Sequence, residues 1–198
     1  VRLAEKYFER IPRGEKPPPE VITHEIEQQA EQRLIGHADT NPTVFIRYQG
    51  VAFNHADSFA LQIMVDLLNG RTGRLYKSLV EEKGLAVGQP MASSNEQKYG
   101  GYIQVGAEVK EGVDPQAVEE ALLAELERLK QELVDERELQ KVKNQELADS
   151  FRRLQNNFFL MIQLAFYDSN DSWEYINEAP PKLQAVTAAD IQRVAQKY

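Results

Sequence analysis

A short helix between two glycine turns, in residues 70–86, constrains the fold of this chain more than any other feature. The segment reads Gly-Arg-Thr-Gly-Arg-Leu-Tyr-Lys-Ser-Leu-Val-Glu-Glu-Lys-Gly-Leu-Ala. Gly70 and Gly73 permit a sharp turn after an apolar helix. Residues 74–83 then predict one short helix with an apolar face, and Gly84 stands where a left-handed residue ends a helix before a strand. The pattern therefore predicts two helices bent at the glycines and leading into a sheet.

Three elements are predicted before this segment. Residues 21–34 alternate weakly and predict a strand with many polar positions near a sheet edge. Residues 43–50 predict a stronger strand, and residues 57–68 predict a buried helix because they are apolar nearly all round.

A β-hairpin is predicted directly after it, with arms at residues 85–92 and 101–109 and a polar turn at 93–99. In the second arm the residues on one face are apolar; they are Ile103, Val105, Ala107 and Val109.

Helices dominate the rest of the chain. Asp114 followed by Pro115 begins one, and Asp135 with Glu138 forms a capping box that begins a second, which the apolar periodicity extends to Ala165. Two shorter helices are predicted from the capping pairs Asp171 with Glu174 and Thr187 with Asp190. Antiparallel strands followed by grouped helices predict an α+β two-layer sandwich with a mostly antiparallel sheet.

The two ends of the chain indicate a tandem organisation. Residues 2–7 and 193–198 share the pattern Arg-apolar-Ala-Glu/Gln-Lys-Tyr, which marks either repeated units or a chance match in a Lys- and Ala-rich helix. Residues 12–19 are rich in proline and predict a stiff linker. We therefore expect residues 1–19 to hold the last helix of a preceding domain with its linker, and residues 20–198 to form a second domain.

Composition excludes several classes of function. The net charge of -8 argues against nucleic acid as a partner, because phosphate binding requires clustered Lys and Arg. The absence of cysteine excludes thiolate metal sites, cysteine nucleophiles and disulfides. No window approaches the roughly 18 apolar residues of a membrane span.

Histidine spacing predicts no metal site in this chain. His24, His37 and His55 are the three histidines, and none has another within five residues. His24-Glu25 begins a false H-E-x-x-H, but Gln28 occupies the last position, and a strand would separate residues four apart by about 13 Å. We predict no metal ligand, no cofactor and no catalytic residue here.

The 70–86 block resembles the signature of the second, metal-free domain of pitrilysin/insulinase-like zinc peptidases, in the mitochondrial processing peptidase branch and its bacterial relatives. The resemblance covers nearly the full chain, and nine positions match the pattern. They are Gly70, Arg74, Leu75, Tyr76, Leu79, Glu82, Gly84, Leu85 and Ala86. We assign these residues a structural role.

The resemblance implies two tandem domains in each half, with zinc held by H-x-x-E-H in the first. It also implies an Arg and a Tyr, seven residues apart, that hold the substrate backbone. Here those positions are Val80 and Val87, which cannot donate a side-chain hydrogen bond. Either a related partner subunit supplies the pair, or the whole protein is a non-catalytic homologue.

Other patterns have plainer interpretations. The glycine-rich turn at 70–74 could bind an anion, but a helix-to-helix turn explains it better. The acidic stretch 119–146 is a solvated helix face. The aromatic-rich region favours core packing, with an inter-subunit face as the alternative; its members are Phe158, Phe159, Phe166, Tyr167, Trp173 and Tyr175.

We therefore expect a non-catalytic C-terminal domain of a zinc metalloendopeptidase subunit, inactive by itself. It would wall off a chamber opposite the zinc domain and help to hold extended peptides, with the strand at 101–109 as a lining element. Zinc is expected in the missing N-terminal domain, and a homo- or heterodimer with a related subunit is expected. The alternatives are a scaffold subunit of the same fold, or an unrelated α+β binding domain. Bacterial relatives are often exported, which favours the periplasm over the cytoplasm.

Overall fold

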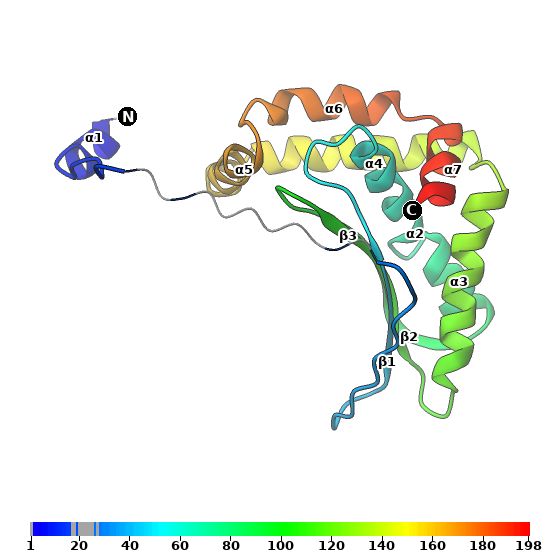
Figure 1. The fold of residues 1–198 in the computed structure, drawn as a ribbon. Coiled ribbons are helices and arrows are strands. Elements are labelled where there is room, and N and C mark those ends of the chain that lie inside the picture. Colours follow the sequence, from blue (N-terminus) through cyan, green and yellow to red (C-terminus); the bar gives the residue numbers. More distant parts are fainter. Residues whose placement is uncertain (1, 17–18, 20–25, 27) are drawn as a thin grey trace.

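The computed structural model describes residues 2–16, 19, 26 and 28–198, and it consists of two layers (Figure 1). One layer is a three-stranded antiparallel sheet in the order β1-β3-β2, made of β1 (Thr43–Gln49), β2 (Ala86–Glu96) and β3 (Gly101–Val109). Helices cover one face of this sheet, and no helix of the described residues packs on the other face. The predicted α+β two-layer sandwich is confirmed.

The helical layer is built from most of the remaining chain. The helices α2, α3 and η1 pack against the sheet, and α7 packs on α2 and α3. Figure 1 shows α4, α5 and α6 across one end of the sheet. The helices are α1 (Arg2–Phe8), α2 (Ser58–Leu68), the π-helix η1 (Tyr76–Glu82), α3 (Pro115–Gln131), α4 (Glu136–Leu154), α5 (Asn157–Asn170), α6 (Tyr175–Ala185) and α7 (Ala188–Lys197).

The core lies between the sheet and α2. Nine of the eleven residues of α2 are buried, as its all-round apolar sequence predicted. The four apolar residues of β3 that face the helical layer (Ile103, Val105, Ala107 and Val109) are at most 5% exposed. Burying side chains of this size stabilises a fold by about 1.5–3 kcal/mol each, so this contact holds the two layers together.

The hairpin differs from the prediction in the length of its first arm. β2 continues to Glu96, and the turn is confined to residues 97–100. Ser93 and Asn95 looked like turn residues because they are polar, but they lie on the uncovered face, where polar side chains stay in contact with water. A bulge at residues 88–90, with Gly88 at φ 65°, lets β2 stay paired with β3 on both sides of it.

The predicted continuous helix to Ala165 is wrong. Asn156 interrupts it, because its side chain accepts hydrogen bonds from the backbone N–H groups of Phe158 and Phe159 and so caps a new helix, α5. The predicted cap at Asp171 is also wrong. Asp171 accepts a 2.6 Å hydrogen bond from Asn54, and α6 begins at Tyr175 without a side-chain cap.

The strand predicted at residues 21–34 is not found in the part of it that the structure describes. Ile26 and residues 28–34 have no ladder bonds, and residues 20–25 and 27 lie outside the described part. The segment contacts β1 through side chains instead: Gln49 donates to the Ile26 carbonyl and accepts from the Gln28 N–H. Leu34 is 94% exposed, so no apolar face draws this segment into the sheet.

Within the described residues, no helix is long and apolar enough to cross a membrane.

Candidate functional site

Two glycines with positive φ bound the signature segment. Gly70 has φ 81° and Gly84 has φ 61°, as predicted for a turn and a left-handed helix end. After Gly84, the Leu85 N–H donates to the Leu79 carbonyl and the Leu85 carbonyl accepts from Lys110, which aligns β2 beside β3. The glycines therefore direct the chain from the helical layer into the sheet.

The short helix is of the π type, where sequence alone predicted a regular helix at 74–83. Leu75 and Leu79 are fully buried, and Arg74 donates to Glu138 at the start of α4. Tyr76 is half-buried, whereas Glu82 is exposed and no described contact explains its match to the signature. Arg74, Leu75 and Leu79 thus tie this helix to α4 and to the core, and the structural role assigned to the whole block stays a prediction.

The two valines that replace the Arg and Tyr of the resembling family lie in different surroundings. Val80 is partly buried and packs against the core. Val87 pairs with Glu108 across the ladder, on the uncovered face of the sheet. Neither has a side-chain donor, so a polar grip on a peptide backbone cannot come from these positions.

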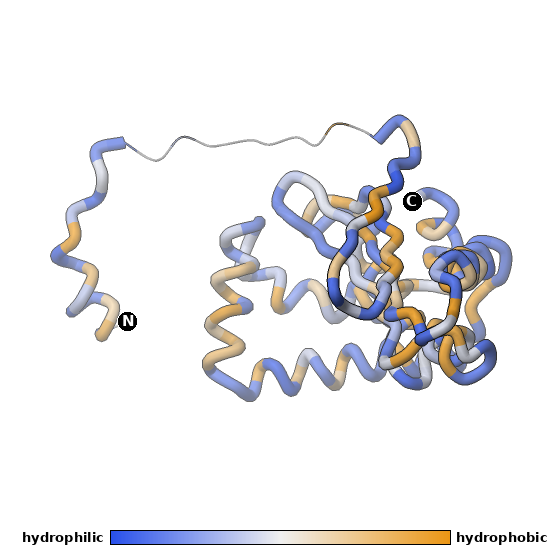
Figure 2. Tube along the Cα trace, turned by 90° about the horizontal axis from the view of Figure 1, so that it is seen from below, coloured by the Kyte–Doolittle hydropathy of each residue, from blue (hydrophilic) through white to orange (hydrophobic). Residues whose placement is uncertain are grey.

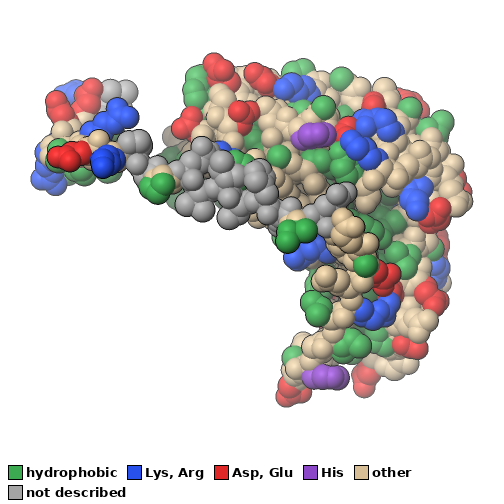
Figure 3. Space-filling view, viewed as in Figure 1, with side chains coloured by type: hydrophobic (Ala, Val, Ile, Leu, Met, Phe, Trp, Pro, Cys, Tyr) green, Lys and Arg blue, Asp and Glu red, His purple; other side chains and the backbone are tan. Residues whose placement is uncertain are grey.

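The uncovered face of the sheet is the surface that the fold leaves available, and we call it the open face. Its cross-strand neighbours were identified from the register and from alternating burial. They are Phe45, Arg47, Val87, Met91, Ser93, Asn95, Tyr102, Gln104 and Glu108, while Gln49 at the end of β1 is already bonded to Ile26 and Gln28. Figure 3 shows that the sheet projects from the helical layer and that the molecule is hollowed between them.

Polar and aromatic groups are held in fixed positions on the open face. The Arg47 guanidinium lies over the Tyr102 ring, 4.1 Å from its centroid, and Arg47 donates to Gln104 Oε1 at 2.6 and 3.1 Å. Asn95 donates to the Tyr102 hydroxyl at 3.2 Å. These four side chains form a row across the sheet that we call the polar ladder. It presents an aromatic ring and a cation to a molecule that lies across the sheet.

An apolar patch lies beside this ladder. Phe45 and Met91 are 54% and 42% exposed, and both pair with Gly106 in the register. A Cβ at position 106 would come within 2.3 Å of the Phe45 ring, so glycine is required for the ring to lie flat on β3. The open face therefore combines an aromatic–apolar centre with hydrogen-bonding groups.

β3 is the central strand, which limits its predicted role. Both of its backbone edges are bonded to β1 and β2, so an added peptide strand cannot pair with it. β3 can contribute only side chains to a binding surface. Strand addition would have to use the outer edge of β1 or β2.

A small cavity of about 340 Å³ lies at the C-terminal end of β2, where its lining includes Phe53, Phe59 and Tyr175. Phe53 contacts Tyr167 and Tyr175 there, with Tyr175 4.5 Å away between ring centroids. Burial raises the pKa of Glu96, which lines the cavity, to about 7. Asp66 on α2 is also affected: burial raises its pKa to about 6 despite hydrogen bonds from Gln62.

The predicted core role of the aromatic-rich region is wrong for most of its members. Tyr167 and Tyr175 pack around Phe53, but the other four are between 47% and 62% exposed; they are Phe158, Phe159, Phe166 and Trp173. Figure 2, which shows α5 along its length, shows hydrophobic residues around this helix. The predicted alternative, an intermolecular face, stays open.

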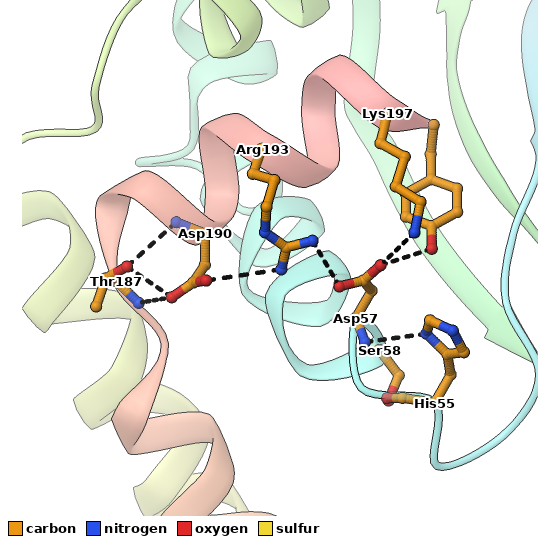
Figure 4. A network of polar contacts seen from close by, with 8 residues as sticks. His55, Asp57, Ser58, Thr187, Asp190, Arg193 and Lys197 are labelled. Atoms are coloured by element: carbon orange, nitrogen blue, oxygen red, sulfur yellow. Dashed lines mark hydrogen bonds and ion pairs between the residues drawn. The ribbon is translucent and has the colours of Figure 1, made fainter.

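A polar network joins the start of α2 to the C-terminal helix (Figure 4). Asp57 is 5% exposed and accepts hydrogen bonds from Arg193, Lys197 and Tyr198. His55 Nδ1 accepts from the Asp57 N–H, so this histidine shapes the turn before α2. Burial alone would raise the pKa of Asp57, but its three hydrogen-bond donors outweigh burial and hold that pKa well below its usual range.

Metal chemistry has no donor set in the described part of the chain. No group of three or more His, Asp or Glu side chains there is arranged to hold an ion. His37 is exposed in a loop, and His24 lies outside the described residues.

Comparison with known families decides the relationship of this chain. A family model described as the peptidase M16 inactive domain matches residues 1–146. The chain belongs to this family. Over 200 residues it is 26% identical to the zinc protease PqqE of Helicobacter pylori, covering 99% of the chain and 45% of PqqE.

Solved structures agree. The crystal structure of a protease from Helicobacter pylori superposes with a TM-score of 0.92 and 25% identity, over 100% of this chain and 48% of that one. A chain of complex III2 from Candida albicans has a TM-score of 0.63 and 16% identity, covering 81% of this chain and 41% of that one, which is a likeness of fold alone. The chain thus spans about half the length of these relatives.

Sequence reasoning missed the polar ladder and the Asp57 network. Arg47, Tyr102 and Gln104 lie on two strands separated by the whole signature segment, and Asp57 looked only like a helix start. The alternation of β1 carried a partial signal for the ladder, because it places Phe45 and Arg47 on the face opposite Val44, Ile46 and Tyr48.

Proposed function

We propose that this chain is the metal-free second domain of a zinc endopeptidase, and that its open face lines the space between it and a zinc-binding domain encoded in the same protein. Extended, unfolded peptides would lie across this face. Membership of the M16 inactive-domain family and the likeness to the protease PqqE support the proteolytic context.

The open face itself carries the proposal. Among the described residues, the helices that pack on the sheet lie on one side of it (Figure 1), and the other side holds an exposed apolar patch beside a fixed Arg47–Tyr102 pair. A peptide chain has backbone carbonyls that accept from guanidinium and amide donors, and apolar side chains that fit against Phe45 and Met91. The domain would hold substrate, and the reaction itself would take place elsewhere.

A related subunit would supply the Arg and Tyr that Val80 and Val87 cannot replace. The second candidate function is a scaffold subunit without proteolysis. The same two valines and the fold likeness to a complex III2 chain favour it.

Photocrosslinking in the full-length protein tests the open face. A photoreactive phenylalanine analogue would replace Phe45 or Met91, and Leu123 on α3, which is 40% exposed, provides the control. An unfolded, labelled peptide should crosslink at positions 45 and 91 and not at 123. Equal crosslinking at all three positions, or none at 45 and 91, would contradict the proposal.

Zinc content and peptide cleavage distinguish the two candidate functions. They should be measured for the full-length gene product, with and without its related partner subunit. Bound zinc with cleavage that requires the full-length chain supports the peptidase. Full-length protein that binds no zinc and cleaves nothing with the partner present supports the scaffold.

A further inference from the structure

The C-terminal helix shows what the repeated Arg-apolar-Ala-Glu/Gln-Lys-Tyr pattern does. In α7, Arg193 Nη1 donates to Asp57 Oδ1 at 2.7 Å, while Lys197 Nζ and the Tyr198 hydroxyl donate to Oδ2 at 2.9 and 2.7 Å. All three donors therefore converge on one buried carboxylate at the first turn of α2 (Figure 4).

The two apolar positions of the pattern pack beneath this clamp, whereas Gln196 is exposed and donates to the Lys130 carbonyl on α3. Val194 is fully buried, and Ala195 packs against the core. Arg193 and Lys197 lie four residues apart, so they project from the same side of the helix. The pattern is thus a docking motif: an apolar residue enters the core while three donors bind an acidic group at the start of another helix.

The N-terminal helix carries the same motif, and its side chains contact no other element within the described residues. Arg2, Lys6 and Tyr7 correspond to Arg193, Lys197 and Tyr198, and Leu3 corresponds to Val194. Leu3 is 70% exposed, and none of the residues of α1 is buried.

The local geometry of the two helices is also shared. Lys6 Nζ lies 5.3 Å from the centroid of the Tyr7 ring, and Lys197 Nζ lies 4.7 Å from that of Tyr198. α1 thus presents the lysine and the ring next to each other, as α7 does.

We propose that α1 docks on a preceding domain of the same fold, where Arg2, Lys6 and Tyr7 bind a carboxylate at the start of the helix equivalent to α2, and Leu3 enters that domain's core. The relatives are about twice as long as this chain, which leaves room for such a domain. If the spacing between Asp57 and Arg193 is repeated, the carboxylate lies about 136 residues before Arg2. The inference rests on the tandem domains of the proposed function, and it does not depend on proteolysis.

Hydrogen exchange of the full-length protein tests this docking. We expect the amides of α1 to exchange at least about 100-fold more slowly than in an isolated peptide of residues 1–16, because helix and contacts would open together. Lys6→Glu should reduce this protection about tenfold or more, since it places a second negative charge at the carboxylate. Tyr7→Phe, which keeps the ring, should give a smaller loss.

Arg10→Ala is the matched control, because Arg10 is an exposed cation just outside the motif. It should leave the protection of α1 unchanged. Exchange of α1 at the rate of the isolated peptide, equal protection in the wild type and Lys6→Glu, or no acidic residue at the equivalent upstream helix start would each overturn the inference.

Proteolysis separates this inference from the proposed function. A full-length protein that cleaves peptides while α1 exchanges freely refutes only the docking. A protein in which α1 is protected and Lys6→Glu releases it, but which cleaves nothing, supports the docking and refutes the peptidase.

Discussion

Arg74 and Glu138 form a bidentate pair, with Nη2 donating to Oε2 at 2.7 Å and Nε to Oε1 at 3.1 Å, and this pair ties the signature segment to the start of α4. In the sequence, Glu138 looked like the second half of a capping box with Asp135. Asp135 does cap α4 through the N–H groups of Arg137 and Glu138, but the Glu138 carboxylate is used by Arg74. The local capping pattern thus assigned the Glu138 carboxylate to the start of α4, whereas in the fold it binds Arg74.

Glu138→Ala should destabilise the protein by about 1–3 kcal/mol, because it leaves Arg74, whose side chain is only 12% exposed, without its carboxylate partner. Urea unfolding measures the change. Glu178→Ala provides the control: its pair with Lys182 is about half exposed on both sides, so it should change stability by less than about 0.5 kcal/mol. Equal effects of the two substitutions would contradict this ranking.

Asp57→Asn should cost about 2–4 kcal/mol at neutral pH, since three donors lose a buried charge. The pKa of Asp57 is lowered in the folded state, so the unfolded chain takes up this proton at higher pH. The stabilisation is therefore full above the ordinary carboxyl pKa of about 4 and is lost as the pH falls below it. Denaturation between pH 3 and 7 should show a shallower acid loss in Asp57→Asn than in the wild type.

The contribution of Glu96 to stability should depend on pH in the opposite direction to that of Asp57. Its pKa is raised to about 7 by burial, so the folded state holds a proton that the unfolded chain releases near pH 4.5, and stability falls as the pH rises between these values. Glu96→Gln, which stays neutral, should be more stable than the wild type by about 1–3 kcal/mol at pH 8 and little different at pH 4. Asp66, whose pKa is also raised by burial, contributes the same pH dependence to the wild type and to Glu96→Gln, so it cancels in the difference. A constant difference across this range would refute the assignment.

Gly73→Ala should be more damaging than Gly70→Ala. A Cβ at Gly73 would lie 2.0 Å from the Asn69 carbonyl oxygen, and backbone must move to accommodate it, which we expect to cost more than about 3 kcal/mol. Gly70 has open space around it, and only its φ of 81° opposes alanine, at about 1–2 kcal/mol. Gly36→Ala, with neither restriction, is the control. Thermal unfolding should rank the three in this order.

Asn156→Ala should destabilise the protein by about 1 kcal/mol and fray the first turn of α5, because two backbone donors lose their acceptor. Circular dichroism and hydrogen exchange at Phe158 and Phe159 measure this. Asn157→Ala, one residue further and exposed, should have little effect. If both variants behave alike, Asn156 is not the cap that divides the two helices.

The sequence by itself determined the signature turn, the buried α2, the apolar face of β3 and the caps at Asp114 and Thr187. Each of these depends on residues close in the chain: a glycine that tolerates positive φ, a periodic apolar face, or a side chain that bonds a backbone group two or three positions away.

Only the tertiary structure decided which polar groups meet. Asp57 and Arg193 lie 136 residues apart, Arg74 and Glu138 lie 64 apart, and the Arg47–Tyr102 pair requires β1 to lie beside β3. Charged and polar side chains have many possible partners of similar energy in an unfolded chain. Which partner each one finds is fixed by the packing of the apolar layers between them, and no local pattern encodes that packing.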